Sequence, residues 1–413
     1  MVASAKTRRC CASRAEDVMR DTGFAHQSWE LQDPPEPGPP PAPHSVRRWV
    51  VRMVGAVLAV VIGVMGLSYT EALTYPGNAS WQSRTTGWVR ALGGGFAVNT
   101  AENWYYTRNP PGNTVPSVSS LPASRAAAPA AAVSGLPVLP LLPGVAALPG
   151  EGRWVPGRVA ADGTPALYTS YFQPDPTHAS VVAGVAFIRA GATRAHLVAG
   201  TTQPGGSWPT TAQVAASDVS ALAATFNSGF KLTDISGGFY ANGRVGKPLQ
   251  AGQASLVINN RGQLSVGQWG RDITMNPHIT AVRQNLALIV DGGHRVSGLR
   301  VNADHRWGTA QNQLQYTWRS GIGTDRAGNV VYVAGNKLTL NTLATAMTNA
   351  GVVRGMQLDI HPGMAFFASW APTGGPHPGP TKMLPTMAGS RTRFLTPDQR
   401  DFFYLTVRGN GLG

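Results

Sequence analysis

Residues 318–363 read WRSGIGTDRAGNVVYVAGNKLTLNTLATAMTNAGVVRGMQLDIHPG, and they carry the clearest secondary-structure pattern in the chain. Residues 319–324 and 330–334 favour β-strands because β-branched side chains recur in both. Between them, Gly328 and Asn329 tolerate the positive φ that a turn needs. The segment therefore predicts a β-hairpin.

A helix is expected directly after the hairpin. Thr339 can cap its N-terminus, and apolar residues recur at i, i+3, i+7 and i+10, starting from Leu340. Gly351 follows this pattern and can end the helix. The spacing predicts a helix of about three turns that packs by one face.

A short buried strand is predicted at residues 356–360, and the Pro-Gly turn at 362–363 ends it. Asp359 and His361 lie at the end of this strand. Functional sites are often built where a rigid scaffold presents polar side chains at its ends. These two residues are therefore the first candidates for chemistry.

The remaining strand signals point to one domain at residues 151–413. Apolar, β-branched runs bounded by Gly or Asn predict strands at residues 181–189, 194–199, 254–259, 279–290 and 402–407. A short helix is expected at residues 218–225. With few helices and no regular βαβ alternation, the fold class is α+β, built on a mixed, strongly twisted sheet.

The N-terminal part predicts a membrane anchor. Residues 1–48 form a Pro-rich tail typical of disorder, and residues 49–70 favour a transmembrane helix because 53–70 carry no charge. Basic residues 47, 48 and 52 precede the uncharged stretch 53–70, so the positive-inside rule places the tail in the cytoplasm and the domain outside it, as in a single-pass cell-membrane protein. A cleaved signal peptide is the alternative interpretation.

Two further segments separate the span from the domain. Residues 71–108 are aromatic and could lie on the bilayer or dock on the domain, whereas residues 109–150 are rich in Pro and Ala, as a linker is. Both cysteines, Cys10 and Cys11, lie in the N-terminal tail. No disulfide framework is therefore expected in the domain.

The formal net charge of +14 favours anionic partners, such as phosphate-bearing glycans, lipid headgroups or nucleic acid. Attraction to the cell's own anionic envelope explains the same charge without a specific ligand. The predicted domain contains a single glutamate, Glu151. Carboxylate chemistry within residues 151–413 is therefore expected to use aspartate.

Three motifs occur in a known order: FNSGF at residues 226–230, RSGIGTD at 319–325 and Leu358–Asp359 after the predicted helix. In this order the chain resembles the phosphodiester glycosidase family over roughly residues 183–370. It departs from the family where IHPG at 360–363 replaces a Gly-Gly-Gly-Ser run. This variant is similar to an actinobacterial branch of the family, which is membrane-anchored.

The resemblance implies a hydrolase that cleaves the glycosidic bond of a sugar-1-phosphodiester in a cell-envelope or external glycan. A phosphate monoester leaves as a stable anion, so the site needs cations, one carboxylate and a base for water. Arg319 is assigned to the phosphate, Asp359 to stabilising the developing sugar cation or attacking it, and His361 to water activation or proton transfer. Each residue has a structural alternative. Arg319 could form a cross-strand ion pair, Asp359 could cap a turn, and His361 could hydrogen-bond the backbone.

Five other polar residues are candidates for substrate binding; they are Asn227, Lys231, Arg283, Asn285 and Asp291. Asn227 could instead form an Asx-turn, and Asp291 a turn before two glycines. Arg283 and Asn285 interrupt an apolar run, where polar groups must be paired or functional.

Absent motifs exclude several enzyme classes. The domain has no Gly-x-Ser-x-Gly elbow, Walker A loop or His-Glu-x-x-His motif, and no basic-aromatic module for nucleic acid. No cofactor is evident, although a divalent cation remains open. Two alternatives to the glycosidase are a non-catalytic envelope- or glycan-binding module that retains the fold, and a phosphodiesterase that cleaves the P–O bond.

Overall fold

A computed structural model describes residues 38, 44–75, 77, 80–123, 128–129, 135–302, 304–308, 310, 312–374 and 377–408. The chain divides into two units, residues 1–62 and 63–413. Most of the predicted disordered tail, including Cys10 and Cys11, lies outside the described residues.

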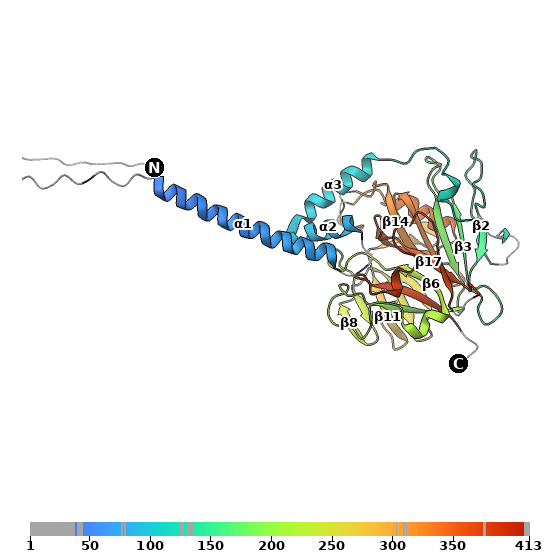
Figure 1. Ribbon diagram of the computed structural model, residues 1–413. Coiled ribbons are helices and arrows are strands. Elements are labelled where there is room, and N and C mark those ends of the chain that lie inside the picture. Colours follow the sequence, from blue (N-terminus) through green and yellow to red (C-terminus); the bar gives the residue numbers. More distant parts are fainter. Residues whose placement is uncertain are drawn as a thin grey trace, which may run out of the picture. The chain divides into compact units, whose positions relative to one another are not determined.

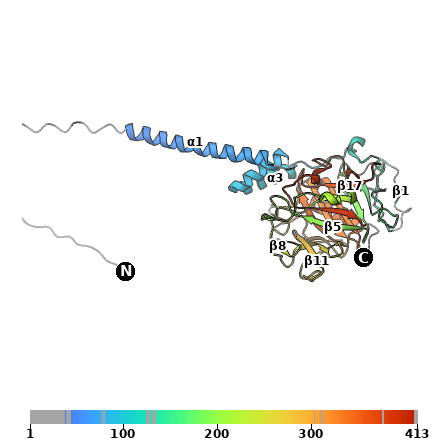
Figure 2. The ribbon, with the colours of Figure 1, turned by 60° about the horizontal axis from the view of Figure 1, so that its bottom comes forward.

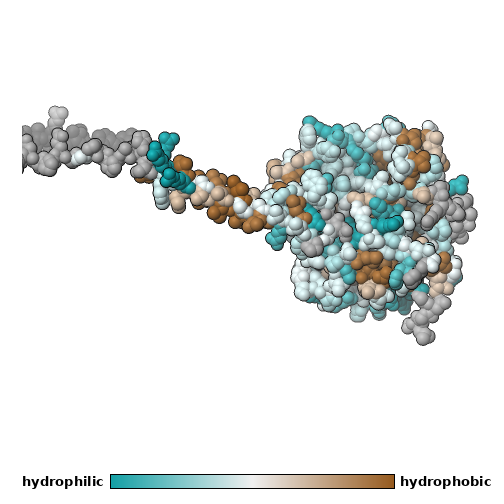
Figure 3. Space-filling view, viewed as in Figure 1, coloured by the Kyte–Doolittle hydropathy of each residue, from teal (hydrophilic) through white to brown (hydrophobic). Residues whose placement is uncertain are grey.

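The first helix, α1 (His44–Thr74), is long and apolar (Figure 1). Residues 46–74 could cross a membrane, since their most apolar window has a mean hydropathy of 2.4 and is not buried. Hydrophobic atoms cover much of its surface in Figure 3. The expectation of one apolar N-terminal helix of membrane-spanning length is confirmed.

Three helical pieces follow α1: α2 (Trp81–Val89), the π-helix η1 (Arg90–Gly94) and α3 (Gly95–Arg108). The end of α1 packs on α2, because the rings of Tyr69 and Trp88 lie 4.9 Å apart and the Trp88 indole N–H donates to Ser68 Oγ at 3.1 Å. These contacts fall within the unit 63–413.

The largest sheet in the described part of the chain has nine strands in the order β1-β2-β3-β4-β15-β14-β16-β12-β13. Their bounds are β1 Ala128–Pro129, β2 Arg153–Pro156, β3 Leu167–Phe172, β4 Ala183–Ile188, β12 Leu288–Asp291, β13 His294–Arg295, β14 Thr317–Thr324, β15 Val330–Leu338 and β16 Arg354–Ile360. Figure 1 shows β2, β3 and β14 within this sheet.

Two five-stranded sheets complete the described strands, in the orders β10-β9-β11-β7-β8 and β18-β17-β6-β19-β5. Their bounds are β5 Thr193–Val198, β6 Leu222–Asn227, β7 Phe239–Ala241, β8 Arg244–Lys247, β9 Ala254–Asn259, β10 Leu264–Gln268, β11 Ile279–Gln284, β17 Phe367–Ala371, β18 Gly379–Lys382 and β19 Phe402–Val407. Figure 2 shows β5 and β17 of the second sheet and β8 and β11 of the first.

The expected α+β class, with extensive sheet and few helices, is confirmed. One detail differs, because a mixed sheet was expected but every strand pairing within the described sheets is antiparallel. The only parallel pairing among the described residues is an isolated bridge from Trp269 to Ile273. Hairpins explain the antiparallel pairing, because short turns join strands that then run in opposite directions. Even β16, reached through a helix, pairs antiparallel with β14.

The hairpin and helix predicted from residues 318–363 are confirmed. Strands β14 and β15 pair across residues 325–329, where Gly328 has φ +81°. Helix α4 (Leu340–Asn349) begins after Thr339, whose side chain accepts from the Thr342 N–H. Gly351 follows the helix with φ +82°.

Two other expectations need correction. The run at residues 279–290 is two strands, β11 and β12, because the Asn285 side chain leaves the ladder to bond the carbonyls of β16. The short helix expected at 218–225 is the 3₁₀ turn η4 (Ala216–Ala221), and β6 begins at Leu222. Two other 3₁₀ turns are η2 (Val118–Ser120) and η5 (Arg393–Leu395).

Alternation along β4 and β15 buries both faces of the nine-stranded sheet. Ala186 and Tyr332 face one core shared with the two smaller sheets, whereas Phe187 and Val331 face a second core with α4. Leu121, Leu139 and Leu148, within the segment expected to be a linker, are buried in these cores.

We predict that Thr339→Ala lowers the free energy of unfolding by about 1 kcal/mol, because the first turn of α4 loses its cap. Urea denaturation of the full chain in detergent measures this change. Thr339→Ser keeps the capping oxygen and should retain most of the stability. Equal losses in both variants would contradict the capping role.

Candidate functional site

A cavity of about 520 Å³ lies between the helical segment 80–108 and one end of the sheets, all within the unit 63–413. The helical wall consists of Ser80, Gln82, Ser83, Thr86, Arg90, Asn99, Glu102 and Tyr106. The opposite wall includes Phe230, Lys231, Asp234, Gln313, Gln315, Asp359, Ile360, His361, Pro362, Met364 and Arg400. The cavity therefore brings together charged groups from distant parts of the chain.

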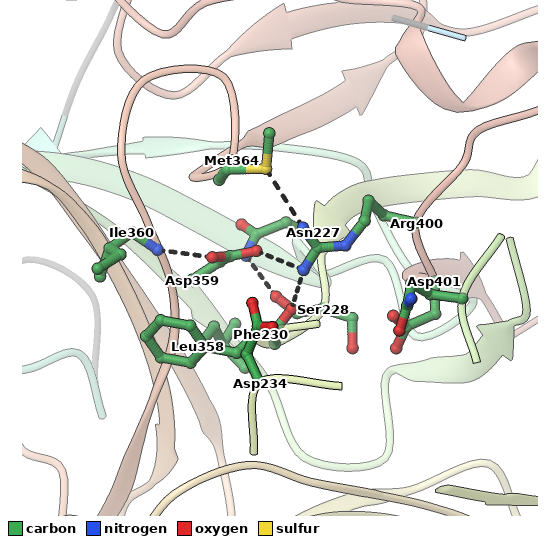
Figure 4. Close-up of polar contacts among 12 residues, drawn as sticks. Asn227, Ser228, Phe230, Asp234, Leu358, Asp359, Ile360, Met364, Arg400 and Asp401 are labelled. Carbon is green, nitrogen blue, oxygen red and sulfur yellow. Dashed lines mark hydrogen bonds and ion pairs between the residues drawn. The ribbon is translucent and has the colours of Figure 1, made fainter. Parts of the chain in front are cut away.

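Asp359 lies near the end of β16 and faces this cavity (Figure 4). Its Oδ2 accepts from Arg400 Nη2 at 2.8 Å, and its Oδ1 accepts from the Ile360 N–H at 2.8 Å. Burial raises the pKa of Asp359, while the charge of Arg400 opposes that rise. A carboxylate so buried depends on its guanidinium partner to stay ionised.

Arg400 precedes β19 and reaches across to the loop that follows β6. Its Nη2 also donates to the Gly229 carbonyl at 2.7 Å, and its Nη1 contacts the Met364 sulfur at 3.5 Å (Figure 4). Among the described residues its buried Nε has no hydrogen-bond partner. This guanidinium retains a donor beside the cavity.

His361 has φ +77°, in the left-handed region that few residues other than glycine adopt. The ring stacks on Tyr106 at 5.0 Å and its Nδ1 lies 3.2 Å from Thr317 Oγ1. Burial lowers the pKa of His361 to about 3, so the ring is neutral at pH 7.

Glu102, on α3, faces the same histidine. Its Oε2 lies 3.5 Å from His361 Nε2 and accepts from Arg90 Nη2 at 2.7 Å. Burial raises the pKa of Glu102, and the charge of Arg90 opposes this. A carboxyl group with a raised pKa beside a neutral imidazole is suited to proton exchange.

Lys231 lines the cavity from the loop after β6. Burial lowers the pKa of Lys231, and the positive charges of Arg400 and Arg90 lower it further. Three cations therefore meet at the cavity, and two of them, Arg400 and Arg90, are paired with the carboxylates of Asp359 and Glu102.

Arg319 is fully buried and is not among the cavity-lining residues. Its Nε donates to the Leu338 carbonyl at 3.0 Å, and its Nη1 donates to Gln313 Oε1 at 3.2 Å. Burial lowers the pKa of Arg319 to about 9. Its positive charge contributes to the low pKa of His361, so it acts on the cavity from beneath the wall.

Asn227 and Asn285 hold the scaffold under the cavity. Asn227 Nδ2 donates to Ser320 Oγ at 3.1 Å, and Ser320 Oγ bonds both the N–H and the carbonyl of Asp359 at 3.2 Å. Asn285 Nδ2 donates to the Leu358 carbonyl at 2.8 Å, and its Oδ1 accepts from the Phe230 N–H. Both amides therefore position the ends of strands that carry cavity residues.

The other two candidates lie elsewhere. Arg283 Nε forms a buried ion pair with Asp401 Oδ2 at 2.7 Å. Asp401 directly follows Arg400 in the sequence. Asp291 belongs to a surface network in which its Oδ2 lies 2.8 Å from Arg271 Nη1. Of the eight predicted site residues, three line the cavity: Lys231, Asp359 and His361.

Sequence reasoning missed Arg90, Glu102 and Arg400. Glu102 is one of two acidic residues between positions 71 and 150. An isolated acidic residue in an aromatic segment was the one sequence signal that could have marked it as a site residue. Arg400 follows no motif. Within the described ranges, no three His, Cys, Asp or Glu side chains gather as metal ligands would.

Residues 215–359 match the sequence model of the phosphodiester glycosidase family. This agrees with the resemblance drawn from the three motifs. The matched segment includes Asn227, Arg319 and Asp359 but ends before His361 and Arg400. No curated protein matches the chain.

Three solved structures are similar to this chain. The catalytic domain of zebrafish N-acetylglucosamine-1-phosphodiester alpha-N-acetylglucosaminidase, auto-inhibited by its pro-peptide, is 14% identical with a TM-score of 0.39; the alignment covers 62% of this chain and 87% of that one. A hypothetical protein from Synechocystis has 14% identity, a TM-score of 0.36 and coverages of 55% and 59%. A putative exported protein from Burkholderia pseudomallei is 12% identical with a TM-score of 0.34; the alignment covers 56% of this chain and 75% of that one.

We predict that Gly229→Ala destabilises the chain by about 1–3 kcal/mol, because a Cβ there would lie 2.9 Å from Asn285 Oδ1. Urea denaturation of the full chain in detergent measures the loss. Gly112→Ala is the matched control, since the nearest atom to its added Cβ is 3.9 Å away. Similar stabilities for the two variants would show that the loop moves freely away from Asn285.

Proposed function

We propose that the phosphodiester glycosidase domain of this chain hydrolyses the glycosidic bond of a sugar-1-phosphodiester in a cell-envelope or external glycan. The observation that carries this proposal is one cavity lined by three carboxyl groups (Glu102, Asp234 and Asp359), a neutral histidine and three cations (Arg90, Lys231 and Arg400). Those are the groups that departure of a phosphate and attack by water require.

The phosphate is bound by Lys231 and Arg400. Burial, and then the positive charges of Arg400 and Arg90, lower the pKa of Lys231, so a bound phosphate anion favours its charged form. Arg400 already holds Asp359 through Nη2 and keeps a buried Nε without a partner among the described residues. A cation that contacts both the phosphate and the carboxylate would align the leaving group with Asp359.

Asp359 faces the anomeric carbon and stabilises positive charge as the C–O bond breaks. The bridging oxygen leaves with the phosphate, which departs as a monoester anion and needs no proton from a general acid. The oxygen of water attacks the anomeric carbon, and the water gives its proton to His361 Nε2. Glu102, 3.5 Å from that nitrogen, stabilises the imidazolium that forms.

Arg319 has a supporting role in this scheme. Burial and the charge of Arg319 keep His361 in its neutral form, in which Nε2 can accept a proton, although both effects also lower its basicity. Asn227 and Asn285 keep the end of β16 in place through the bonds to Ser320 and to Leu358. Arg283 holds Asp401 and with it the start of β19 beside Arg400.

We also propose that α1 anchors the domain outside the cytoplasm. Arg47, Arg48 and Arg52 precede its most apolar part, and cytoplasmic flanks are enriched in such residues. A substrate in the cell envelope is then within reach of the anchored domain.

A non-catalytic glycan-binding module is the second candidate. It is favoured by one observation: both oxygens of Asp359 already have partners, Arg400 and the Ile360 N–H. A carboxylate held in this way can serve structure alone. The same cations would then bind a phosphate-bearing glycan without turnover.

We predict that the full chain in detergent releases free sugar from some member of a panel of synthetic sugar-1-phosphodiesters. Asp359→Asn should lower the rate by roughly 10²–10³-fold, because the developing positive charge loses its stabilising carboxylate. Asp291→Asn is the control, since its surface network lies outside the cavity. Equal rates in wild type and Asp359→Asn would refute the assignment.

Hydrolysis in ¹⁸O-labelled water identifies the bond that breaks. Label in the sugar indicates C–O cleavage, whereas label in the phosphate indicates a phosphodiesterase. No release from any member of the panel, together with binding of the same compounds, would favour the glycan-binding module.

The pH dependence provides a separate prediction. Asp359 must be ionised, and burial raises its pKa, so the acidic limb of kcat/KM should lie above the ordinary aspartate value of about 3.9. Arg400→Met removes a charge that lowers this pKa, so the limb should move to higher pH. Arg354→Met, at an exposed ion pair, should leave it in place. An unchanged limb in Arg400→Met would contradict the coupling of Arg400 to Asp359.

A further inference from the structure

Helix α3 lines the cavity with one side and exposes large aromatic side chains on another. Its polar residues Asn99 and Glu102 face the cavity, together with Tyr106. Its exposed side, called here the outer face, carries Phe96, Ala97, Ala101, Trp104 and Tyr105, together with the polar residues Thr100 and Arg108. These positions recur every three to four residues, so they form one stripe along the helix.

The exposure on this stripe is large. Phe96 is 77% exposed, Trp104 58% and Tyr105 54%. Trp81 on α2 and Leu92 on η1 are also exposed, so the whole helical segment presents large apolar side chains. Large aromatic side chains that stay exposed within the described part of the chain, on a helix that also lines a cavity, favour an apolar partner.

The chain itself indicates that partner. Residues 46–74 of α1 are long and apolar enough to cross a membrane, and six residues separate Thr74 from Trp81. The end of α1 also packs on α2, through the ring contact of Tyr69 with Trp88 and a 2.8 Å hydrogen bond from Tyr69 to Thr85. The helical segment therefore begins where α1 ends, at the boundary of any bilayer that α1 enters.

We propose that the outer face of α3 lies in the interface of the bilayer entered by α1. Tryptophan and tyrosine favour this zone, because an apolar ring and a polar edge are both satisfied there. Arg108 supports the assignment: its guanidinium lies 5.3 Å from the Trp104 ring, where it can reach lipid phosphates. Lipid then holds the helix whose opposite face forms a wall of the cavity.

This proposal does not depend on catalysis, and a spectroscopic experiment tests it. The full chain, with Cys10→Ser and Cys11→Ser, is placed in nanodiscs that hold one copy each and contain phosphatidylcholine and phosphatidylglycerol. The dye NBD is attached at Ala101→Cys on the outer face. Lipids with a doxyl quencher near the headgroup are then added.

Two further probes serve as references. Ala327→Cys, an exposed alanine at the β14–β15 turn, is the matched control. It lies at the opposite end of β14 from α3, because Tyr316, just before β14, bonds to the Tyr106 carbonyl, and the strand is on the order of 25 Å long. Val60→Cys, within α1, reports whether that helix is inserted.

The Ala101 probe should show blue-shifted emission and should be quenched several-fold more strongly than the Ala327 probe. Equal, weak quenching of the Ala101 and Ala327 probes would overturn the proposal. A water-like, unshifted NBD emission from the Val60 probe would also overturn it, because α1 would then not enter the bilayer. A blue shift in detergent at high protein concentration that is lost in single-copy nanodiscs would assign the outer face to a second copy of this chain instead.

Discussion

One buried amide, that of Asn227, joins the two sheets on which the cavity depends. Asn227 ends β6, and its side chain bonds to Ser320 on β14 and accepts from Tyr332 on β15 at 2.7 Å. It also accepts from the Phe366 N–H at 2.9 Å. A buried amide with all of its partners in place fixes one arrangement of its neighbours, since any displacement leaves an unpaired polar group.

The position of Asp359 follows from that constraint. Ser320, held by Asn227, bonds both backbone groups of Asp359, so the carboxylate leaves β16 in a fixed direction. Charge then determines the rest of the cavity. Asp359 needs Arg400 and Glu102 needs Arg90, because a buried carboxylate without a cation would take up a proton.

The part of the fold that sequence predicted well is local. Thr339, Gly351 and the turn around Gly328 act within a few residues of themselves, and the structure has each element where the pattern indicated it. The break in the run 279–290 was not predicted, because the Asn285 side chain bonds to β16, far along the chain. Asp359 and His361 could be identified because strand ends and short motifs mark such positions.

The hairpin, the helix, the apolar α1 and the family motifs can be read from the sequence, since periodicity, caps and turn residues are short-range features. The folded chain is needed to see that Glu102 faces His361, that Arg400 holds Asp359 and that Arg319 lies beneath the cavity. Such pairs come from packing between elements distant in the chain, and no local spacing encodes which buried charges will meet.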